Sequence, residues 1–339
     1  MVLVREIFLQ KENKMNSKSV PYYPSLVGDV GGTNVRFALI KSAEGKPEDI
    51  MVFSCADYPS LQAALQKYLQ FFPDVMVRNA CIGIANPVLG DIVRMTNCNW
   101  EFSIEELRIA TKLDQLLVVN DFRALATAVP SLQPGEYRQI GSGCTQVNAP
   151  IALIGPGTGL GVASLFPCGD EYVCIEGEGG HSTLPSVGCE EAEVVLYIQR
   201  EYSHVSAERV LSGPGIETLY RALAATRGLA ADSLDAASIS DAALNSSDRL
   251  ARDTLDMFCG MLGCVAGNLA ITLGARGGVF IGGGIVPKLG NYFNESSFRK
   301  RFESKGRFSS YMSTIPSYVI DAPYSALTGA SILLKRALC

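Results

Sequence analysis

The sequence has 339 residues, a formal net charge of −5 and a pI near 5.3, with 47% hydrophobic and 19% charged residues. This composition excludes an intrinsically disordered chain and supplies enough apolar material for a buried core, and the length suggests about two domains. The negative charge argues against a general surface for nucleic acids or acidic membranes, whereas a nucleotide can still be bound through backbone N–H groups and Mg²⁺.

Residues 1–21 predict an N-terminal extension without a targeting signal. Arg5 and Glu6 interrupt the apolar start too early for a signal-peptide core, and Glu12 is unlike a transit peptide. Met15 is an alternative start of the chain. The 10 cysteines include no CxxC pair and no zinc-site spacing, so we interpret them as the reduced thiols of a cytoplasmic protein.

Residues 26–40 predict a β-hairpin, because two apolar runs flank a turn of glycine and small polar residues. Gly31 and Gly32 lack a Cβ atom, so another group can approach their backbone, and successive N–H groups can form an anion-binding concavity. Asp29 ends the first strand, and a carboxylate beside bound phosphate requires an intervening cation such as Mg²⁺. A plain tight hairpin explains the same residues, so both interpretations stay open.

Strands and helices are then predicted in turn. Short apolar runs predict strands at residues 51–55, 80–85 and 91–95. A helix with an apolar stripe at helical spacing is predicted after Pro59 and Ser60. Another is predicted at Ser103, because Ser103 and Glu106 have the spacing of a capping box.

The apolar run 116–119 predicts a strand that ends at Asn120 and Asp121, and a helix opens at Phe122. Open α/β sheets bind ligands just beyond the carboxyl ends of their strands, so Asn120 and Asp121 are candidates for ligand contact. The alternative is that one of them only caps the helix, and the two roles are compatible.

Residues 151–165 repeat the design of the first hairpin, with a strand, a turn rich in glycine and threonine, and a second strand. Residues 27–39 and 153–165 align with their turns in register. The repeat predicts two similar α/β domains that face each other across a cleft. The strict Rossmann spacing is missing here, and no Walker A motif occurs in the chain.

Two later segments carry candidate polar contacts. Residues 176–181 predict a glycine-rich loop in which Glu178 and His181 can converge on one polar ligand, although a solvated loop explains them as well. Residues 206–215 predict a short capped helix ended by Gly-Pro. Glu208 would lie in its first turn, where the helix macrodipole favours a carboxylate without any ligand.

The rest of the chain predicts helices around two strands. Residues 217–251 are alanine-rich and helical, with a polar surface loop at 232–246. Residues 257–275 are uncharged and long enough to span a membrane, but their glycines favour a buried, tightly packed helix. Residues 277–287 predict a strand that runs into three glycines, whose backbone an adenine and its ribose can approach. The last predicted elements are a strand at 317–320 and a helix at 325–338.

Together these motifs resemble the bacterial-type glucokinase family of the actin-like, hexokinase-like ATPase fold, over about residues 25–334. The segments that carry the resemblance are residues 29–34 (Asp-Val-Gly-Gly-Thr-Asn), 120–122 (Asn-Asp-Phe), 155–161, 177–181, 206–215 and 282–287. Related sugar kinases carry a cysteine-rich zinc motif after the histidine. Here only Gly188-Cys189-Glu190 stands in that region, so the zinc-free branch is the better match.

The resemblance implies an ATP-dependent kinase that phosphorylates D-glucose at its 6-hydroxyl, with Asp121 as the general base. The implied sugar contacts are Asn120, Asp121, Glu178, His181 and Glu208. The implied ATP contacts are Gly28, Asp29, Val30, Gly31, Gly32, Thr33, Asn34, Gly157, Thr158, Gly159, Gly283 and Gly284. Asp29 would act on Mg²⁺ through water, and His181 and Glu208 would serve the anomeric end of the sugar.

The resemblance also implies two actin-like (ribonuclease H-like) α/β domains on either side of an active-site cleft. The smaller would comprise residues 22–131 with 317–339, and the larger residues 132–316. The implied partners are glucose, ATP and a second copy of the chain in a homodimer, with no nucleic acid and no membrane.

Three alternatives remain. A kinase for another hexose or an N-acetylhexosamine is the nearest, because the shape around the 2- and 4-hydroxyls decides between these sugars. A non-catalytic sugar sensor is disfavoured by the presence of Asp121 and by an extension too short for a DNA-binding domain. A cytoskeletal or chaperone-like ATPase of the same fold would have no use for Glu178, His181 and Glu208.

Overall fold

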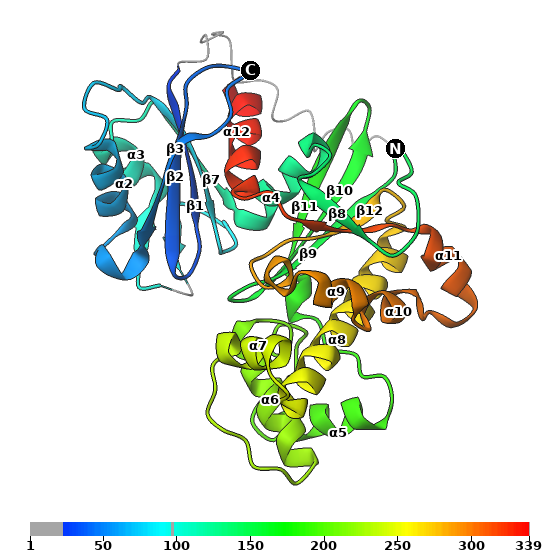
Figure 1. The fold of residues 1–339 in the computed structure, drawn as a ribbon. Helices are drawn as coiled ribbons and strands as arrows, with labels where there is room; N and C mark the ends of the chain where they lie inside the picture. The colour runs from blue at the N-terminus through cyan, green and yellow to red at the C-terminus, as the bar shows by residue number, and fades with distance from the viewer. Residues whose placement is uncertain (1–22, 96–97, 339) are drawn as a thin grey trace. The chain divides into compact units, whose positions relative to one another are not determined.

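The computed structural model describes residues 23–95 and 98–338, so the predicted extension and Met15 lie outside the described residues. The chain divides into two compact units, which we call unit 1 (up to Asp121, and from Ala330 onward) and unit 2 (Phe122–Gly329) (Figure 1). The expected domain boundaries, at residues 131 and 317, differ from these limits.

Unit 1 is built on a five-stranded sheet with the strand order β3-β2-β1-β4-β7. β1, β2 and β3 are antiparallel neighbours, whereas β4 and β7 run parallel to β1. The predicted hairpin is therefore confirmed as β1 and β2. The strands are β1 (Ser25–Val30), β2 (Asn34–Ile40), β3 (Glu48–Ser54), β4 (Asn79–Ile84) and β7 (Gln115–Asn120).

Two helices, α2 (Leu61–Leu69) and α3 (Ile104–Ala110), belong to unit 1, and both begin at the predicted caps. Ser60 Oγ accepts a hydrogen bond from the Ala63 amide, and Ser103 Oγ accepts one from the Glu106 amide. The apolar side of α2 packs on the sheet, where the rings of Tyr68 and Phe37 lie 5.5 Å apart. The smaller elements are η1 (Cys55–Asp57), β5 (Ile92–Arg94) and β6 (Glu101–Ser103).

The sheet of unit 2 has six strands in the order β11-β10-β9-β12-β13-β8. Its first five strands repeat the order and directions of the unit 1 sheet, with two antiparallel pairs followed by two parallel pairs. The prediction of two similar α/β domains is thus confirmed. The strands are β8 (Tyr137–Ile140), β9 (Ile151–Pro156), β10 (Leu160–Cys168), β11 (Glu171–Gly177), β12 (Gly278–Ile281) and β13 (Ser317–Ile320).

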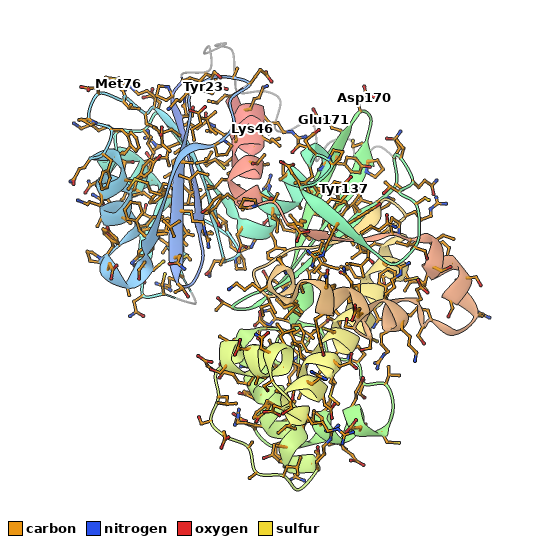
Figure 2. All side chains as sticks on the ribbon, viewed as in Figure 1. Tyr23, Lys46, Met76, Tyr137, Asp170 and Glu171 are labelled. Atoms are coloured by element: carbon orange, nitrogen blue, oxygen red, sulfur yellow. The ribbon has the colours of Figure 1, made fainter. Side chains whose placement is uncertain are left out.

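The strands β8 and β11 were not predicted from the sequence. The strand β13 was predicted, but it was assigned to the smaller domain. β11 continues from β10 through a turn at Gly169 (φ +62°), with Asp170 and Glu171 at its tip (Figure 2). β13 pairs with β12 and β8 and so lies in the sheet of unit 2, although residues 317–339 were expected to join the smaller domain. Long-range strand pairing, which leaves no local pattern, decides where β13 lies, whereas β11 pairs with the adjacent strand β10.

The helices of unit 2 include one that was predicted as a polar loop. α7 is capped by Asp235 and buries Ile239 and Ala243, which are four residues apart and pack into the core of the unit. Its many polar residues face away from that core. The helices are α4 (Asp121–Ala128), α5 (Cys189–Ile198), α6 (Gly213–Thr226), α7 (Ala236–Asn245), α8 (Arg249–Leu273), α9 (Asn291–Glu295), α10 (Phe298–Glu303), α11 (Ser309–Thr314) and α12 (Ser325–Leu338), the last of which continues into unit 1. The short 3₁₀ helices are η2 (Val129–Ser131), η3 (Gly179–His181), η4 (Val286–Leu289) and η5 (Gly306–Phe308).

α8 is the buried helix that the sequence predicted. Among the described residues it alone is long and apolar enough to cross a membrane, and 78% of its apolar window is buried inside the protein. Gly263 and Gly267 face α10, where a Cβ atom on either would press against the backbone carbonyl of Phe298 or Phe302. These glycines let the two helices approach closely.

Gly263→Ala is expected to lower the free energy of unfolding by about 1–3 kcal/mol, because the added methyl group overlaps backbone that cannot move aside. Gly260→Ala is the matched control on the same helix, since its methyl group crowds the Ser297 hydroxyl, which is a side-chain atom, and otherwise makes ordinary contact with the Arg301 side chain. The higher helix propensity of alanine, about 1 kcal/mol, offsets that contact. Urea unfolding of both variants measures the difference, and equal stability of the two would contradict this account of the packing.

Candidate active site

The β1–β2 turn presents unpaired backbone amides. The Gly31 amide donates to the Asn34 carbonyl (2.9 Å), and the Cys55 amide donates to the Thr33 carbonyl (2.8 Å), which fastens the turn to the chain after β3. Within the described chain, the amides of Gly32 and Thr33 donate to no other residue. Two adjacent free N–H groups in a glycine turn suit an anionic oxygen.

Asp29, at the end of β1, forms an ion pair with Arg36 of β2 (Oδ2 to NH1, 2.9 Å). Its side chain is 16% exposed, and burial raises the pKa of Asp29 above its usual value while the Arg36 charge opposes that shift. Arg36 received no role from the sequence, although its position directly across the hairpin from Asp29 follows from the strand register.

The donor set around Asp29 is compatible with Mg²⁺ held mainly by a nucleotide. The described residues contain no group of three or more His, Cys, Asp or Glu side chains able to hold a metal. Mg²⁺ is commonly held by one or two carboxylates, several waters and substrate phosphates. A single carboxylate beside a turn with free amides fits that pattern.

Gly28 and Val30 flank Asp29 on β1, and packing inside unit 1 explains why a glycine and a valine occupy these positions. The Val30 side chain is fully buried in the core of unit 1. A Cβ atom on Gly28 would lie 3.1 Å from the Phe37 ring and 3.3 Å from Ile82. Both residues are buried within the sheet between β2 and β4, so neither offers a side chain to a nucleotide.

The β9–β10 turn repeats this arrangement in unit 2. The Gly157 amide donates to the Gly159 carbonyl, and the Gly213 amide at the start of α6 donates to the Gly157 carbonyl (2.8 Å each). Within the part of the chain that the structure describes, the amides of Thr158 and Gly159 donate to no other residue. We call residues 157–159 the phosphate turn, after the phosphate contact that the family resemblance implies for them.

The glycines after β12 lie beside the phosphate turn. Gly283 has a left-handed backbone (φ +78°), and a Cβ atom there would overlap the Pro156 carbonyl, so its identity is fixed by packing against the end of β9. Gly284 has open space around it. The Ile285 amide also donates to the Pro156 carbonyl (3.4 Å). This leaves an open backbone at Gly284 next to the phosphate turn.

Phe122 is a site residue whose role the sequence did not reveal. Its ring lies against Gly155 and Gly161, the two ends of the β9–β10 hairpin turn, and a Cβ atom on Gly161 would overlap the ring. Phe122 directly follows Asp121 in the chain. The paired absence of side chains at positions 155 and 161 was the sequence signal that a large group packs there.

Three of the five expected sugar contacts come together within unit 2. His181 Nε2 lies 3.8 Å from Glu178 Oε2 and 3.9 Å from Glu208 Oε1. Glu178 is the N-cap of η3 and His181 is its last residue, where the chain turns after β11. The side chains of Glu178, His181 and Glu208 are 59%, 58% and 33% exposed, so all three groups remain open to a polar ligand on one side. We call Glu178, His181 and Glu208 the polar triad.

The short capped helix predicted within residues 206–215 is wrong, because residues 206–212 form no helix. This segment forms turns, and Gly213-Pro214 opens α6 instead of ending a helix, with Ser212 as its N-cap. Proline at the first helical turn costs no hydrogen bond, because its missing N–H would be unpaired there anyway. The Glu208 carboxylate therefore does not face a helix dipole of its own segment. It accepts a hydrogen bond from the Leu160 amide instead (2.9 Å).

Asn120 and Asp121 lie in unit 1, where β7 ends and α4 begins. Asn120 Nδ2 donates to the Asn86 carbonyl (3.4 Å), and Asn86 Nδ2 in turn donates to the Arg94 carbonyl (2.9 Å). Asn86 is a further residue that the sequence left without a role. It orients the Asn120 amide from the end of the neighbouring strand β4.

Comparison with known proteins places these features in one family. Residues 26–337 match the family model described as Glucokinase. The chain is 52% identical to a glucokinase from Aromatoleum aromaticum over 93% of its own length and 96% of the relative. It is 50% identical to one from Chromobacterium violaceum over 91% of its own length and 88% of the relative.

Solved structures agree with this assignment. A glucokinase from an Antarctic psychrotroph aligns with a TM-score of 0.82 and 40% identity, covering 93% of this chain and 99% of that one. A glucokinase of the ROK family from Streptomyces griseus, at 18% identity and a TM-score of 0.63, shares the fold. The expected actin-like α/β fold is thereby confirmed, and the chain belongs to the glucokinase family.

Proposed function

We propose that this protein transfers the γ-phosphoryl group of ATP to the 6-hydroxyl of D-glucose. The observation that carries the proposal is the polar triad, in which the Glu178 and Glu208 carboxylates each lie within 4 Å of the His181 imidazole, beside a turn with free backbone amides. A sugar hydroxyl both donates and accepts hydrogen bonds, so a set of carboxylates and an imidazole can pair several hydroxyls at once. A site built to pair these hydroxyls discriminates against analogues that lack them.

In this proposal Asp121 is the general base. It would accept the proton of the 6-hydroxyl as that oxygen attacks the γ-phosphorus of ATP, which requires an approach of about 2.6–3.2 Å in the productive complex. Asn120 would bind the middle of the ring together with Glu178, and His181 and Glu208 would bind its anomeric end. Asp121 belongs to unit 1 and the triad to unit 2.

The nucleotide would use the two glycine turns. The free amides of Gly32 and Thr33 and those of Thr158 and Gly159 would bind phosphate oxygens, and the open backbone at Gly284 would border adenosine. Phosphoryl transfer depends mainly on positioning and on stabilising the charge of the transferred group. Mg²⁺, bound to the phosphates and through water to Asp29, would supply part of that charge stabilisation.

We also propose a cytoplasmic homodimer. The nine cysteines in the described part of the chain are free thiols, as expected in a reducing compartment. The homodimer rests on family resemblance, and light scattering of the purified protein tests it. A monomer at micromolar concentration would remove this part of the proposal without affecting the rest.

The test of the activity is a coupled assay of ADP release with Mg-ATP and a panel of sugars. The panel contains glucose, mannose, fructose, galactose, N-acetylglucosamine and N-acetylmannosamine. Turnover confined largely to glucose supports the proposal. Turnover on another hexose or an N-acetylhexosamine would keep the reaction and replace the substrate, and glucose binding without any turnover would favour a sugar sensor.

Glu208→Gln is expected to raise the KM for glucose by about tenfold, because a neutral amide accepts a weaker hydrogen bond than a carboxylate does. The fold should be unaffected, since glutamine can still accept from the Leu160 amide. Steady-state kinetics at saturating ATP give the result. An unchanged KM for glucose would argue against the place assigned to Glu208.

Removal of Mg²⁺ with a chelator is expected to abolish turnover, and added Mg²⁺ should restore it, because the phosphate charge is otherwise unneutralised. Thermal unfolding in the same buffers is the control. The midpoint should not change without nucleotide, since no described cluster binds a metal structurally. Full activity in the chelator would exclude Mg²⁺ as a cofactor.

A further inference from the structure

We infer that the Glu208 carboxylate couples the sugar site to the phosphate turn, so that each ligand changes the affinity for the other through this one side chain. The inference rests on the proposed function for the identity of the two ligands. It goes beyond that function because it gives Glu208 a positioning role toward ATP in addition to its sugar contact.

The two carboxylate oxygens of Glu208 have different partners. Oε2 accepts the hydrogen bond of the Leu160 amide, the first residue of β10 after the phosphate turn (2.9 Å). Oε1 faces His181 Nε2 at 3.9 Å, on the side of the polar triad. One carboxylate thus joins the phosphate turn to the polar triad. The two residues in this hydrogen bond, Leu160 and Glu208, are 48 positions apart in the sequence.

The backbone around Glu208 is fastened to both loops as well. The Glu208 amide donates to the Gly180 carbonyl (2.9 Å) in residues 178–181, which we call the sugar loop. The Glu208 carbonyl accepts from Ser212 Oγ (2.8 Å). Ser212 caps α6, whose first amide, that of Gly213, holds the Gly157 carbonyl. With its main chain fixed in this way, Glu208 can respond to a ligand mainly by rotating its carboxylate.

Such a rotation has a predictable effect on the phosphate turn. A sugar hydroxyl that donates to Oε1 binds the same carboxylate whose Oε2 accepts the hydrogen bond of the Leu160 amide. The position of this amide sets the exit of the turn, and with it the direction of the free Thr158 and Gly159 amides. Because binding linkage is reciprocal, a nucleotide that reorients the turn must change sugar affinity by the same factor.

Gly159 offers a way to disturb this contact without altering either partner. A Cβ atom at position 159 would lie 2.5 Å from Glu208 Oε2 and 3.3 Å from Cδ. The crowded atoms are the end of a flexible side chain, so the carboxylate would swing away from the Leu160 amide while the backbone stays in place. Gly159 does not have the left-handed φ that would strain alanine. Gly177→Ala is the matched control, since it adds a methyl group in open space in the same unit.

Calorimetry of glucose binding to the full chain without nucleotide is the first test. Gly159→Ala should weaken glucose affinity by at least about fivefold, the lower end of typical coupling between sites, although the substitution lies in the phosphate turn. Gly177→Ala should bind glucose as the wild type does. Repeating the titrations with saturating AMPPNP gives the ratio of glucose affinities with and without nucleotide, which should fall toward one in Gly159→Ala only.

Equal glucose affinity in Gly159→Ala and the wild type, or an unchanged ratio, would overturn the inference. Hydrogen exchange of the Leu160 amide in the ligand-free protein decides the contact independently. Exchange should be slow in the wild type and at least about tenfold faster in Glu208→Ala and Gly159→Ala, and equal rates would also overturn the inference. If the wild type bound no glucose, the proposed function would fail, and the exchange result would still report whether Glu208 holds the phosphate turn.

Discussion

Replacing Asp121 by asparagine is expected to lower kcat for glucose phosphorylation by about 10²–10⁴-fold or more, the usual contribution of a general base. Asparagine has nearly the same shape but cannot accept the proton of the 6-hydroxyl. Glucose binding should persist, because the polar triad and Asn120 remain. Steady-state kinetics and glucose calorimetry on the same preparation separate the two effects.

Asp114→Asn is the control for this substitution. Asp114 directly precedes β7, whereas Asp121 directly follows it, and the Asp114 side chain is 66% exposed and forms a surface ion pair with Arg78. Exposed pairs of this kind contribute at most about 1 kcal/mol, so kcat should stay at the wild-type level. A kcat of Asp121→Asn close to that of Asp114→Asn would remove Asp121 from the role of base.

Gly180→Ala is expected to weaken glucose binding by about tenfold or more, corresponding to about 1.4 kcal/mol. A Cβ atom at position 180 would overlap the Leu160 carbonyl, which is backbone and cannot rotate away. The Gly180 carbonyl also accepts the Glu208 amide, so a shift of residue 180 displaces both His181 and Glu208. Overpacking of this kind should also lower the free energy of unfolding by about 1–3 kcal/mol.

Gly177→Ala serves as the matched control, because it lies three residues earlier and meets no atom within 4 Å. Glucose calorimetry and urea unfolding on both variants measure the two effects. Wild-type glucose affinity in Gly180→Ala would show that the sugar loop does not depend on this close packing, and it would weaken the case for the polar triad as a preorganised site.

The sequence by itself determined the elements whose signals are local. The two hairpins follow from apolar runs around glycine turns, and the starts of α2 and α3 follow from Ser60 and Ser103, because a cap acts within three residues. The strand ending at Asn120 and Asp121 and the closing strand and helix were predicted for the same reason. The motif combination also indicated the glucokinase family, which the comparisons confirmed.

The tertiary structure decided what depends on distant partners. α7 forms in a polar segment because Ile239 and Ala243 pack into the unit 2 core. β13 joins unit 2 because it pairs with β12 and β8. α7 does carry local signals in its Asp235 cap and in the spacing of Ile239 and Ala243, whereas the strands that pair with β13 are far from it along the chain.

Glu208 shows most clearly the difference between what a local sequence rule predicts and what the folded chain supplies. A local rule assigned its carboxylate to a helix dipole, whereas the fold supplies the Leu160 amide, 48 positions away, as its partner. The ring of Phe122 likewise explains the glycines at 155 and 161 only once β9 and β10 are folded against it. Sequence periodicity records which residues are buried, but the identity of a neighbour across the fold is set by packing that only the folded chain contains.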